Sequence, residues 1–301
     1  MKHSFLLKKD YDFLSQALSE ELAFLSLSII KKQMRLGEVR VNGVKVLKDT
    51  SVLKGEEVKI FLPKANDKTN EPLDIVFEND IILAINKPIL CEVETHLAGL
   101  VNKTYPNAMP LHRLDRNTKG LVLFSKNNDV HDKLLKLFKD KKIKKYYRAH
   151  VVGVPKIKKA EVTVYLKKMA EKSLVLVSNA PKKGYSEAVL NYEVIEEFSD
   201  NTSILDILLI TGKTHQIRAT LSHLGHPIIG DGKYGNDKAN RSFNVAYQRL
   251  LAYKIEFLSD FGDNDTLKSL KNKQICLKSC EIIKKMWINC EFLLDNYIYV
   301  C

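Results

Sequence analysis

Apolar residues recur along this chain at two different periods, and the change of period separates a short N-terminal part from a longer remainder. Two N-terminal groups have helical spacing: Phe13, Leu14, Ala17 and Leu18, and then Leu27, Ile30 and Met34. Val39 and Val41 alternate with polar residues before Asn42-Gly43, a dipeptide that favours tight hairpin turns. The pattern predicts two helices followed by a hairpin of short strands.

The remainder is dominated by segments that are rich in β-branched residues or alternate between apolar and polar positions. These segments are 74–88, 121–126, 146–154, 161–166, 173–178, 188–195 and 203–212. Helical periodicity is clear in 129–143, through Val130, Leu134, Leu137 and Phe138, and a shorter helix is expected at 216–224. Because strands outnumber helices and do not alternate with them regularly, we expect an α+β fold with a mostly antiparallel, mixed sheet.

Residues 63–72, PKANDKTNEP, are polar, bracketed by prolines and without periodicity, as is typical of a linker. We therefore predict a small domain at 1–62, a linker at 63–72 and a large domain at 73–301. A linker of this composition would leave the small domain mobile on the free protein.

The 301 residues carry a formal net charge of +12 at pH 7, and the excess is concentrated in one region. Between Lys126 and Lys159 there are twelve Lys or Arg and three Asp. Clustered positive charge favours a polyanionic partner, most often nucleic acid. A general preference for lysine in the proteome of origin is the alternative explanation.

No stretch approaches the length of about 18 apolar residues that a membrane helix needs. The apolar segment near the N-terminus is too short for a signal peptide, and the five cysteines suit reduced thiols, so we expect a cytoplasmic protein. Cys276 and Cys280 have C-x₃-C spacing, but no second tight pair follows, so no metal site is predicted.

Three segments carry polar residues that local structure does not require. In PLHRLDRNTKGL, Asp115 lies between Arg113 and Arg116. A neighbouring cation favours the charged carboxylate, which can act as nucleophile or base, although a salt bridge in a loop would explain the trio as well. In KKYYRAHVVG, alternation places Tyr147 and Tyr146 on opposite faces of a strand. The third segment, 211–235, clusters His215, Gln216 and Arg218 at the start of its helix.

Other assignments of these segments fail on spacing. A phosphate-binding loop would need a lysine where Asp231 follows Gly230. A zinc site at His215, His223 and His226 would lack an acidic or cysteine ligand at a usual spacing. An aspartyl-phosphatase would have a second acid in place of Asn117.

Taken together, HRLDRNTKGLVLF, then K-x-Y-x-A-x-V-x-G, then TGKTHQIRATLSHLGHPIIGDGKYG resemble the RluA-type family of RNA pseudouridine synthases. With Asn86-Lys87-Pro88 upstream, the resemblance covers about residues 10–257. The helix–helix–hairpin pattern at the N-terminus resembles the ribosomal-protein-S4-like RNA-binding domain. The combination is most similar to the branch of the family that modifies large-subunit ribosomal RNA.

The resemblance implies a role for each matching position. Asp115 matches the aspartate that attacks the target uridine, so that uracil leaves C1′ and reattaches through C5. Arg218 matches its charge partner, and Tyr147 the tyrosine that packs against the base and assists loss of the C5 proton. Ile217 would support the uracil from the other side, and Arg113 would fill the gap left by the extruded nucleotide.

Further contacts follow from the same motifs. Substrate contacts are expected from His112, Arg116, Lys145, His215 and Gln216, and RNA contacts in the small domain from Lys31, Lys32, Arg35 and Arg40. The family needs neither a metal nor an organic cofactor, and we expect a monomer with RNA, most simply 23S ribosomal RNA, as partner and with no membrane or obligate protein partner.

Two features leave the substrate open. Lys119 stands where the family has a small residue, and the segment between His96 and His112 is shorter than the family pattern. A synthase acting on tRNA, or on both RNA classes, therefore remains an alternative. So does a non-catalytic RNA-binding or ribosome-assembly factor on the same fold. Residues 258–301 carry no family signal.

Overall fold

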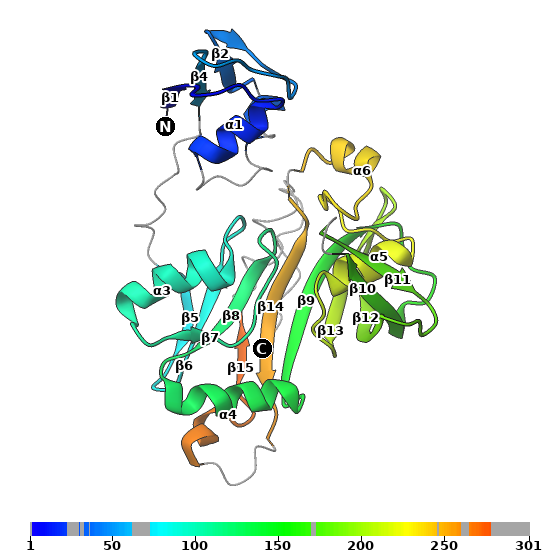
Figure 1. The fold of residues 1–301 in the computed structure, drawn as a ribbon. Helices are drawn as coiled ribbons and strands as arrows, with labels where there is room; N and C mark the ends of the chain where they lie inside the picture. The colour runs from blue at the N-terminus through cyan, green and yellow to red at the C-terminus, as the bar shows by residue number, and fades with distance from the viewer. Residues whose placement is uncertain are drawn as a thin grey trace. The chain divides into compact units, whose positions relative to one another are not determined.

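The computed structural model describes residues 2–22, 30, 33–35, 37–61, 73–169, 173–245, 247–259 and 265–277. The chain forms two compact units, Met1–Pro72 and Leu73–Cys301 (Figure 1). The proposed linker at 63–72, together with Leu27, Lys31, Lys32 and Cys280, lies outside the described residues.

The first unit contains an antiparallel four-stranded sheet and the helix α1 (Leu14–Glu21). Its strand order is β1 (Lys2–Leu6), β4 (Glu57–Phe61), β2 (Val39–Val41) and β3 (Val44–Lys45). Asn42 and Gly43 join β2 to β3 with positive φ angles of 49° and 85°, so the predicted hairpin is confirmed. Helix α1 buries Leu14, Ala17 and Leu18 in the core of this unit, whereas Phe13, the fourth residue of the predicted group, precedes the helix and is exposed.

The second unit is built on one eleven-stranded sheet. Its main path runs β11 (Leu174–Ser178), β10 (Lys159–Met169), β12 (Ser186–Phe198), β13 (Thr202–Leu209), β9 (Ile143–Val152), β14 (Leu250–Phe257), β8 (Lys119–Ser125), β6 (Ile82–Lys87) and β5 (Ile75–Glu78). Two short strands join it: β7 (Met109–Pro110) pairs with β8, and β15 (Gln274–Cys276) pairs with β14. All pairings are antiparallel except that of β14 with β8. The expected mixed, mostly antiparallel sheet is therefore confirmed.

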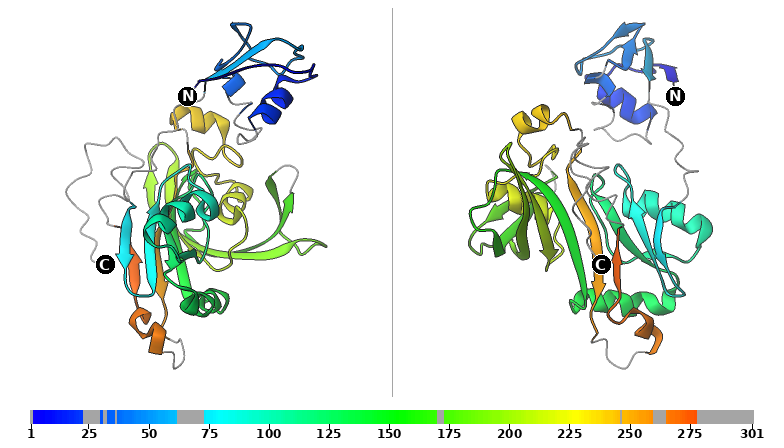
Figure 2. Two further views of the ribbon diagram at one scale, coloured as in Figure 1. Left: turned by 60° about the vertical axis from the view of Figure 1, so that its left-hand side comes forward. Right: turned by 180° about the vertical axis from the view of Figure 1, so that it is seen from behind.

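The sheet is buried on both faces around β6 and β8, which explains their unbroken apolar sequences. On one face, Leu121 and Leu123 pack with the helix α4 (Asn128–Lys139), which crosses the ends of the strands (Figures 1 and 2). On the other face, Val122 and Phe124 join a core that includes the helix α3 (Ala98–Thr104). Because successive side chains of a strand point to opposite faces of the sheet, neighbouring residues of β8 belong to two separate cores.

The remaining helical segments are short, and the sequence pattern missed most of them. They are a π-helical turn at Val93–Leu97, α5 (Gln216–His223), α6 (Asp237–Ser242) and a 3₁₀ segment at Asp265–Leu270. Only α5 was expected. None of the helices in the described part of the chain is long and apolar enough to span a membrane.

Candidate active site

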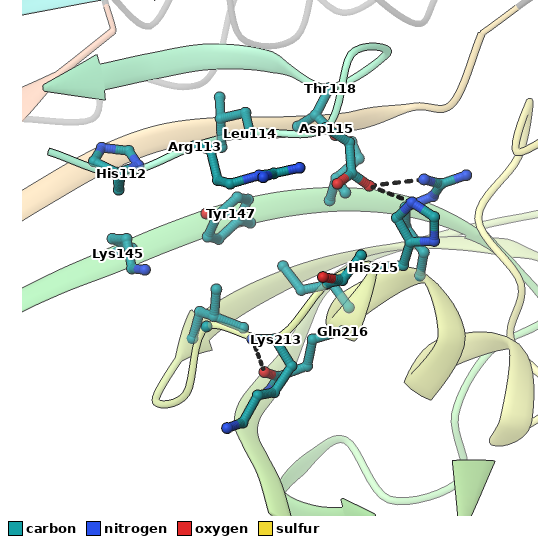
Figure 3. Close-up of a pocket in the computed structure, with 16 residues that line it drawn as sticks. His112, Arg113, Leu114, Asp115, Thr118, Lys145, Tyr147, Lys213, His215 and Gln216 are labelled. Atoms are coloured by element: carbon teal, nitrogen blue, oxygen red, sulfur yellow. Dashed lines mark hydrogen bonds and ion pairs between the residues drawn. The ribbon is translucent and has the colours of Figure 1, made fainter. Parts of the chain in front are cut away.

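A cavity of about 300 Å³ opens between the β7–β8 loop, strand β9 and the start of α5 (Figure 3). Its lining brings together residues that lie more than a hundred positions apart, among them Asp115, Tyr147 and Arg218. The expected substrate-contact residues His112, Arg113, Lys145, His215, Gln216 and Ile217 also line it. The three motifs, which are separate in the sequence, therefore meet in one cavity.

Hydrogen bonds from buried polar groups hold the loop that carries Asp115 in place. Thr118 donates its backbone N–H to the carbonyl of Asp115 at 2.9 Å, and Gln248 donates to the Thr118 hydroxyl at 2.6 Å. Lys87, which is fully buried, donates its ammonium to the carbonyls of Pro88 and Cys91 at 2.8 Å and of Arg116 at 3.2 Å. Burial lowers the pKa of Lys87 to about 8. Asp115 consequently stands on a loop that side chains from two other segments hold in place.

Gly120, the second residue of β8, allows the parallel contact with β14. Its φ is +125°, and a Cβ at this position would overlap the backbone carbonyl oxygen of Ala252. Only glycine accommodates both the conformation and the close approach. The loop of Asp115 is thus anchored where β8 meets β14, directly beside β9 and Tyr147.

Arg218 holds Asp115 and Asp231 at the same time. Its Nη1 donates to Asp115 Oδ2 at 2.7 Å, while Nε and Nη2 donate to the two oxygens of Asp231 at 2.7 and 2.8 Å. Burial opposes the charge on Arg218, but its bonds to the two carboxylates offset this and raise its pKa. Burial alone would raise the pKa of Asp231, yet Arg218 and two backbone N–H groups keep it below the usual range. The result is a buried, fixed cation that orients the Asp115 carboxylate.

His215 approaches the same oxygen of Asp115 that Arg218 bonds, with its Nε2 3.9 Å from Asp115 Oδ2. Its Nδ1 is 2.8 Å from the hydroxyl of Tyr234, and that hydroxyl accepts the backbone N–H of Val175. Because Tyr234 can donate its own proton to Nδ1, we infer that the ring proton of His215 sits on Nε2, facing Asp115. Burial lowers the pKa of His215, which favours the neutral form of the ring.

Tyr147 and Ile217 form apolar walls of the cavity, and both side chains are 5% exposed. Tyr147 belongs to the core that contains Ala149 and Val151, as the strand alternation predicts. Burial, and then the charge of Asp115, raise the pKa of Tyr147 well above its ordinary value. The phenol therefore stays protonated, and its ring is available to pack against a base.

His112 and Lys145 lie at the end of the cavity opposite Asp115 and His215 (Figure 3). The backbone N–H of Leu123 donates to His112 Nε2 at 3.1 Å, so the ring proton is on Nδ1, which is buried without a hydrogen-bond partner among the described residues. Burial, and then Lys145, lower the pKa of His112 to about 3. Lys145 lies over the ring of Phe138, 5.6 Å from its centroid.

Several expected contact residues lie elsewhere or are engaged by the protein. Arg113 lines the cavity but is largely exposed and pairs with Glu94 of the π-helical turn at 3.3 Å. Arg116 is exposed and outside the cavity lining. The amide of Gln216 bonds Thr211, Lys213 and Val189, so Gln216 braces the loop before α5 rather than offering its amide to a ligand.

Of the four basic residues expected to contact RNA in the small domain, Arg35 and Arg40 belong to the described part of the chain. Lys31 and Lys32 lie outside the described residues. Arg35 is exposed, and Arg40 on β2 lies over the ring of Phe61, 5.3 Å from its centroid. The structure therefore brings together the large-domain residues and leaves the small-domain prediction as it stood.

Sequence reasoning missed three residues that shape the site: Asp231, Tyr234 and Lys87. Asp231 was noted only because it breaks a phosphate-loop pattern. Arginine has more N–H donors than one carboxylate can accept, so a buried Arg218 paired with Asp115 would be expected to have a second acceptor. Asp231 and Tyr234 belong to the GDGKYG sequence at 230–235, which turns back toward α5. Neither partner is identifiable from spacing alone.

The comparison with known proteins agrees with this geometry. Residues 83–223 match the model of the family described as RNA pseudouridylate synthase. Ribosomal large subunit pseudouridine synthase D of Vibrio parahaemolyticus is 32% identical over 242 residues, covering 74% of this chain and 72% of the relative. Ribosomal large subunit pseudouridine synthase C of Buchnera aphidicola subsp. Baizongia pistaciae is 32% identical over 259 residues, covering 77% and 81%.

Solved structures show the same fold at lower sequence identity. Human RNA Pseudouridylate Synthase Domain Containing 1 superposes with a TM-score of 0.61 at 20% identity, covering 75% of this chain and 91% of that one. The mixed sheet and the shared motifs thus define an RNA-modifying isomerase. The chain belongs to the RNA pseudouridylate synthase family and is an RNA pseudouridine synthase.

Proposed function

We propose that this enzyme converts specific uridines of large-subunit ribosomal RNA to pseudouridine, with Asp115 as its nucleophile. The observation that carries the proposal is the Asp115–Arg218 pair in a cavity walled by Tyr147 and Ile217. Relatives about as long as this chain are named for the same modification of the large ribosomal subunit, which supports the choice of RNA.

The chemistry places clear demands on the site. The bond from C1′ to N1 of uracil breaks, a bond from C1′ to C5 forms, the C5 proton leaves and N1 gains a proton. Asp115 Oδ2 is held by Arg218, while Oδ1 has no hydrogen-bond partner among the described residues. One oxygen is therefore fixed and the other is available to attack the nucleoside.

The target must leave its base stack to reach this cavity, because the glycosidic bond is inaccessible inside a helix. Tyr147 and Ile217 would then hold the uracil between them, with the protonated phenol of Tyr147 serving to pack against the base. Arg113, which is 68% exposed at the cavity mouth, is placed to leave Glu94 and enter the gap in the RNA.

The first unit is proposed to be an S4-like RNA-binding domain, with the linker and domain boundaries predicted above. Its support is the helix α1 followed by the β2–β3 hairpin, with Arg35 and Arg40 on the intervening segment and the hairpin. In the second unit, the lysines of α4 and the following turn would contact phosphates, so affinity should fall as salt rises.

A deletion strain tests the proposal directly. Pseudouridines are mapped in ribosomal RNA and tRNA of the strain without the protein, and again after it receives the wild type or Asp115→Asn. We expect a 23S site to disappear, to return with the wild type and to stay absent with Asp115→Asn. Loss of a tRNA site alone would move the substrate to tRNA, and rescue by Asp115→Asn would contradict the assignment of Asp115.

A further inference from the structure

A second cavity, of about 460 Å³, adjoins the first and has no part in the chemistry proposed above. The two cavities share four lining residues: His112, Lys145, Leu209 and Gly212. The second cavity therefore continues from the end of the first that is farthest from Asp115 (Figure 3). Its remaining lining comes from the end of α4, the turn into β9 and the end of β13.

The second cavity is strongly positive. Four lysines line it, Lys139, Lys141, Lys144 and Lys145, and no acidic residue of the described chain does so. Lys145 has no hydrogen-bond acceptor or carboxylate partner among the described residues, and burial lowers its pKa. A half-buried ammonium without a partner is costly unless a ligand supplies one.

A second donor in the shared wall is also unsatisfied. His112 carries its ring proton on Nδ1, and this atom is buried with no partner in the described part of the chain. His112 packs against Phe138, with ring centroids 5.3 Å apart. Two donors, one charged and one neutral, thus lie at the boundary between the cavities with no side-chain acceptor among the described residues.

The floor of the second cavity is apolar. It consists of Leu111, Phe138, Ile143, Leu208, Leu209 and Ile210. Leu208 and Ile210, near the end of β13, remain half-exposed and belong to neither of the large buried clusters of the second unit. An apolar floor with a cationic rim fits a ligand that combines a flat apolar ring with a phosphate, and the volume lies in the usual range of about 300–1,000 Å³ for ligand sites.

We propose that the second cavity binds the nucleotide adjoining the target uridine in the same RNA strand, with its base against Leu208 and Phe138 and its phosphate at Lys145. The inference rests on the proposed function, because covalent continuity of the strand is what places a nucleotide here. Binding of this neighbour would hold the strand in its extruded form and make the identity of the adjoining base part of target selection.

A matched pair of variants tests the cationic rim. Lys139→Gln/Lys141→Gln removes two lysines that line the cavity, whereas Lys182→Gln/Lys183→Gln removes two exposed lysines of the β11–β12 loop that line neither cavity. Both change the net charge equally. With an unmodified 23S ribosomal RNA transcript as probe, we expect the first variant to raise KM about tenfold with kcat little changed, and the second to change KM less than about threefold.

A substituted RNA tests the apolar floor. The fragment containing the mapped target is made with an abasic residue on either side of the uridine. On one side, base removal should weaken binding to the wild type roughly tenfold, because a held base contributes on this scale. In Leu208→Ala the same removal should cost clearly less, since the floor is already impaired. Thermal unfolding of each variant confirms that it is folded.

The outcomes separate this inference from the proposed function. Absence of any pseudouridine with the wild type would contradict the proposed function, while affinities of the two double variants for the transcript would still test the rim. Equal affinities would overturn the subsite. Equal costs of base removal in wild type and Leu208→Ala would also overturn it, leaving a positive surface that attracts the RNA backbone without holding a nucleotide.

Discussion

Arg218 donates to Asp115 through Nη1, the one guanidinium nitrogen that does not bond Asp231. The side chain of Asp231 is fully buried, and it also accepts backbone N–H groups from Lys233 and Tyr234 at 2.9 and 3.1 Å. The direction of the Asp115 carboxylate therefore depends on a residue outside the cavity lining.

Asp231→Asn should damage both stability and activity. The substitution keeps the shape of the side chain but leaves Arg218 buried with a single carboxylate, and losing one partner of a buried pair costs about 3–5 kcal/mol. Urea unfolding measures the stability, and pseudouridine formation at a temperature where the variant is folded measures the rate. A rate within twofold of wild type would show that Asp231 does not position Arg218.

Asp115→Asn should abolish catalysis and leave the fold intact. Asp115 is 23% exposed and Asp231 keeps both of its bonds to Arg218, so this amide costs less stability than Asp231→Asn, but it is not a nucleophile. We expect turnover to fall by at least about a thousandfold, with RNA affinity within a few-fold of wild type. Single-turnover assays and filter binding with the same transcript measure the two quantities; a parallel loss of affinity would indicate that Asp115 mainly binds RNA.

Gly120→Ala should disrupt the junction of β8 with β14. A Cβ there collides with the Ala252 backbone, and a positive φ of 125° adds strain, so we expect a loss of about 2 kcal/mol or more. Gly99→Ala is the matched control, because Gly99 is exposed within α3 and a Cβ there meets nothing within 4 Å. The control should be neutral or stabilising by up to about 1 kcal/mol. Similar unfolding curves for the two variants would refute this account of Gly120.

Glu94→Gln should release Arg113 for RNA. The Arg113–Glu94 pair is exposed, so its loss changes stability by less than about 1 kcal/mol. RNA affinity should rise a few-fold in the wild-type background and clearly less in an Arg113→Ala background, because the benefit acts through Arg113. Filter binding of the four combinations measures this coupling, and an equal gain in both backgrounds would attribute the effect to the removed negative charge alone.

Stability should decrease as the pH falls below about 6.5 because of buried histidines. Burial, and then Arg249, lower the pKa of His150 to about 4, while the unfolded side chain titrates near 6.5. Between these values the unfolded chain binds the extra proton, so acid favours unfolding by about 1.4 kcal/mol per pH unit for each such group. Urea unfolding between pH 5 and 5.5 should show a shallower pH slope in His150→Asn, and an unchanged slope would exclude this contribution.

The sequence predicted the strands best where burial imposes a simple pattern. The alternating apolar residues of β9 and the unbroken apolar sequence of β8 were both identified, because one or both faces of each strand are buried. The insertion of β14 between β8 and β9 was not predicted, since strand pairing across a hundred residues leaves no local trace. The pairing of Arg218 with Asp231 was not predicted either, because it leaves no local pattern in the sequence.

Part of the candidate site was also predicted from the sequence, and part was not. Asp115, Tyr147 and Arg218 were found through the resemblance of three motifs, and their meeting in one cavity agrees with that expectation, while their roles remain to be tested. The second cavity was not expected, because its lining comes from α4, β9 and β13 and no single segment has a recognisable pattern. The lysines of α4 and the following turn formed one positively charged group in the sequence, and only the tertiary structure separates Lys139, which lines this cavity, from Lys133, which does not.

The position of β14 has a consequence for synthesis on the ribosome. Residues 250–257 are made long after Asp115 and Tyr147, yet this strand lies between the strands that follow and carry them. A nascent chain that ends before β14 holds both side chains without the strand that sets their separation. Catalytic competence should therefore arise late in synthesis, when residues 250–257 have left the exit tunnel and paired with β8 and β9.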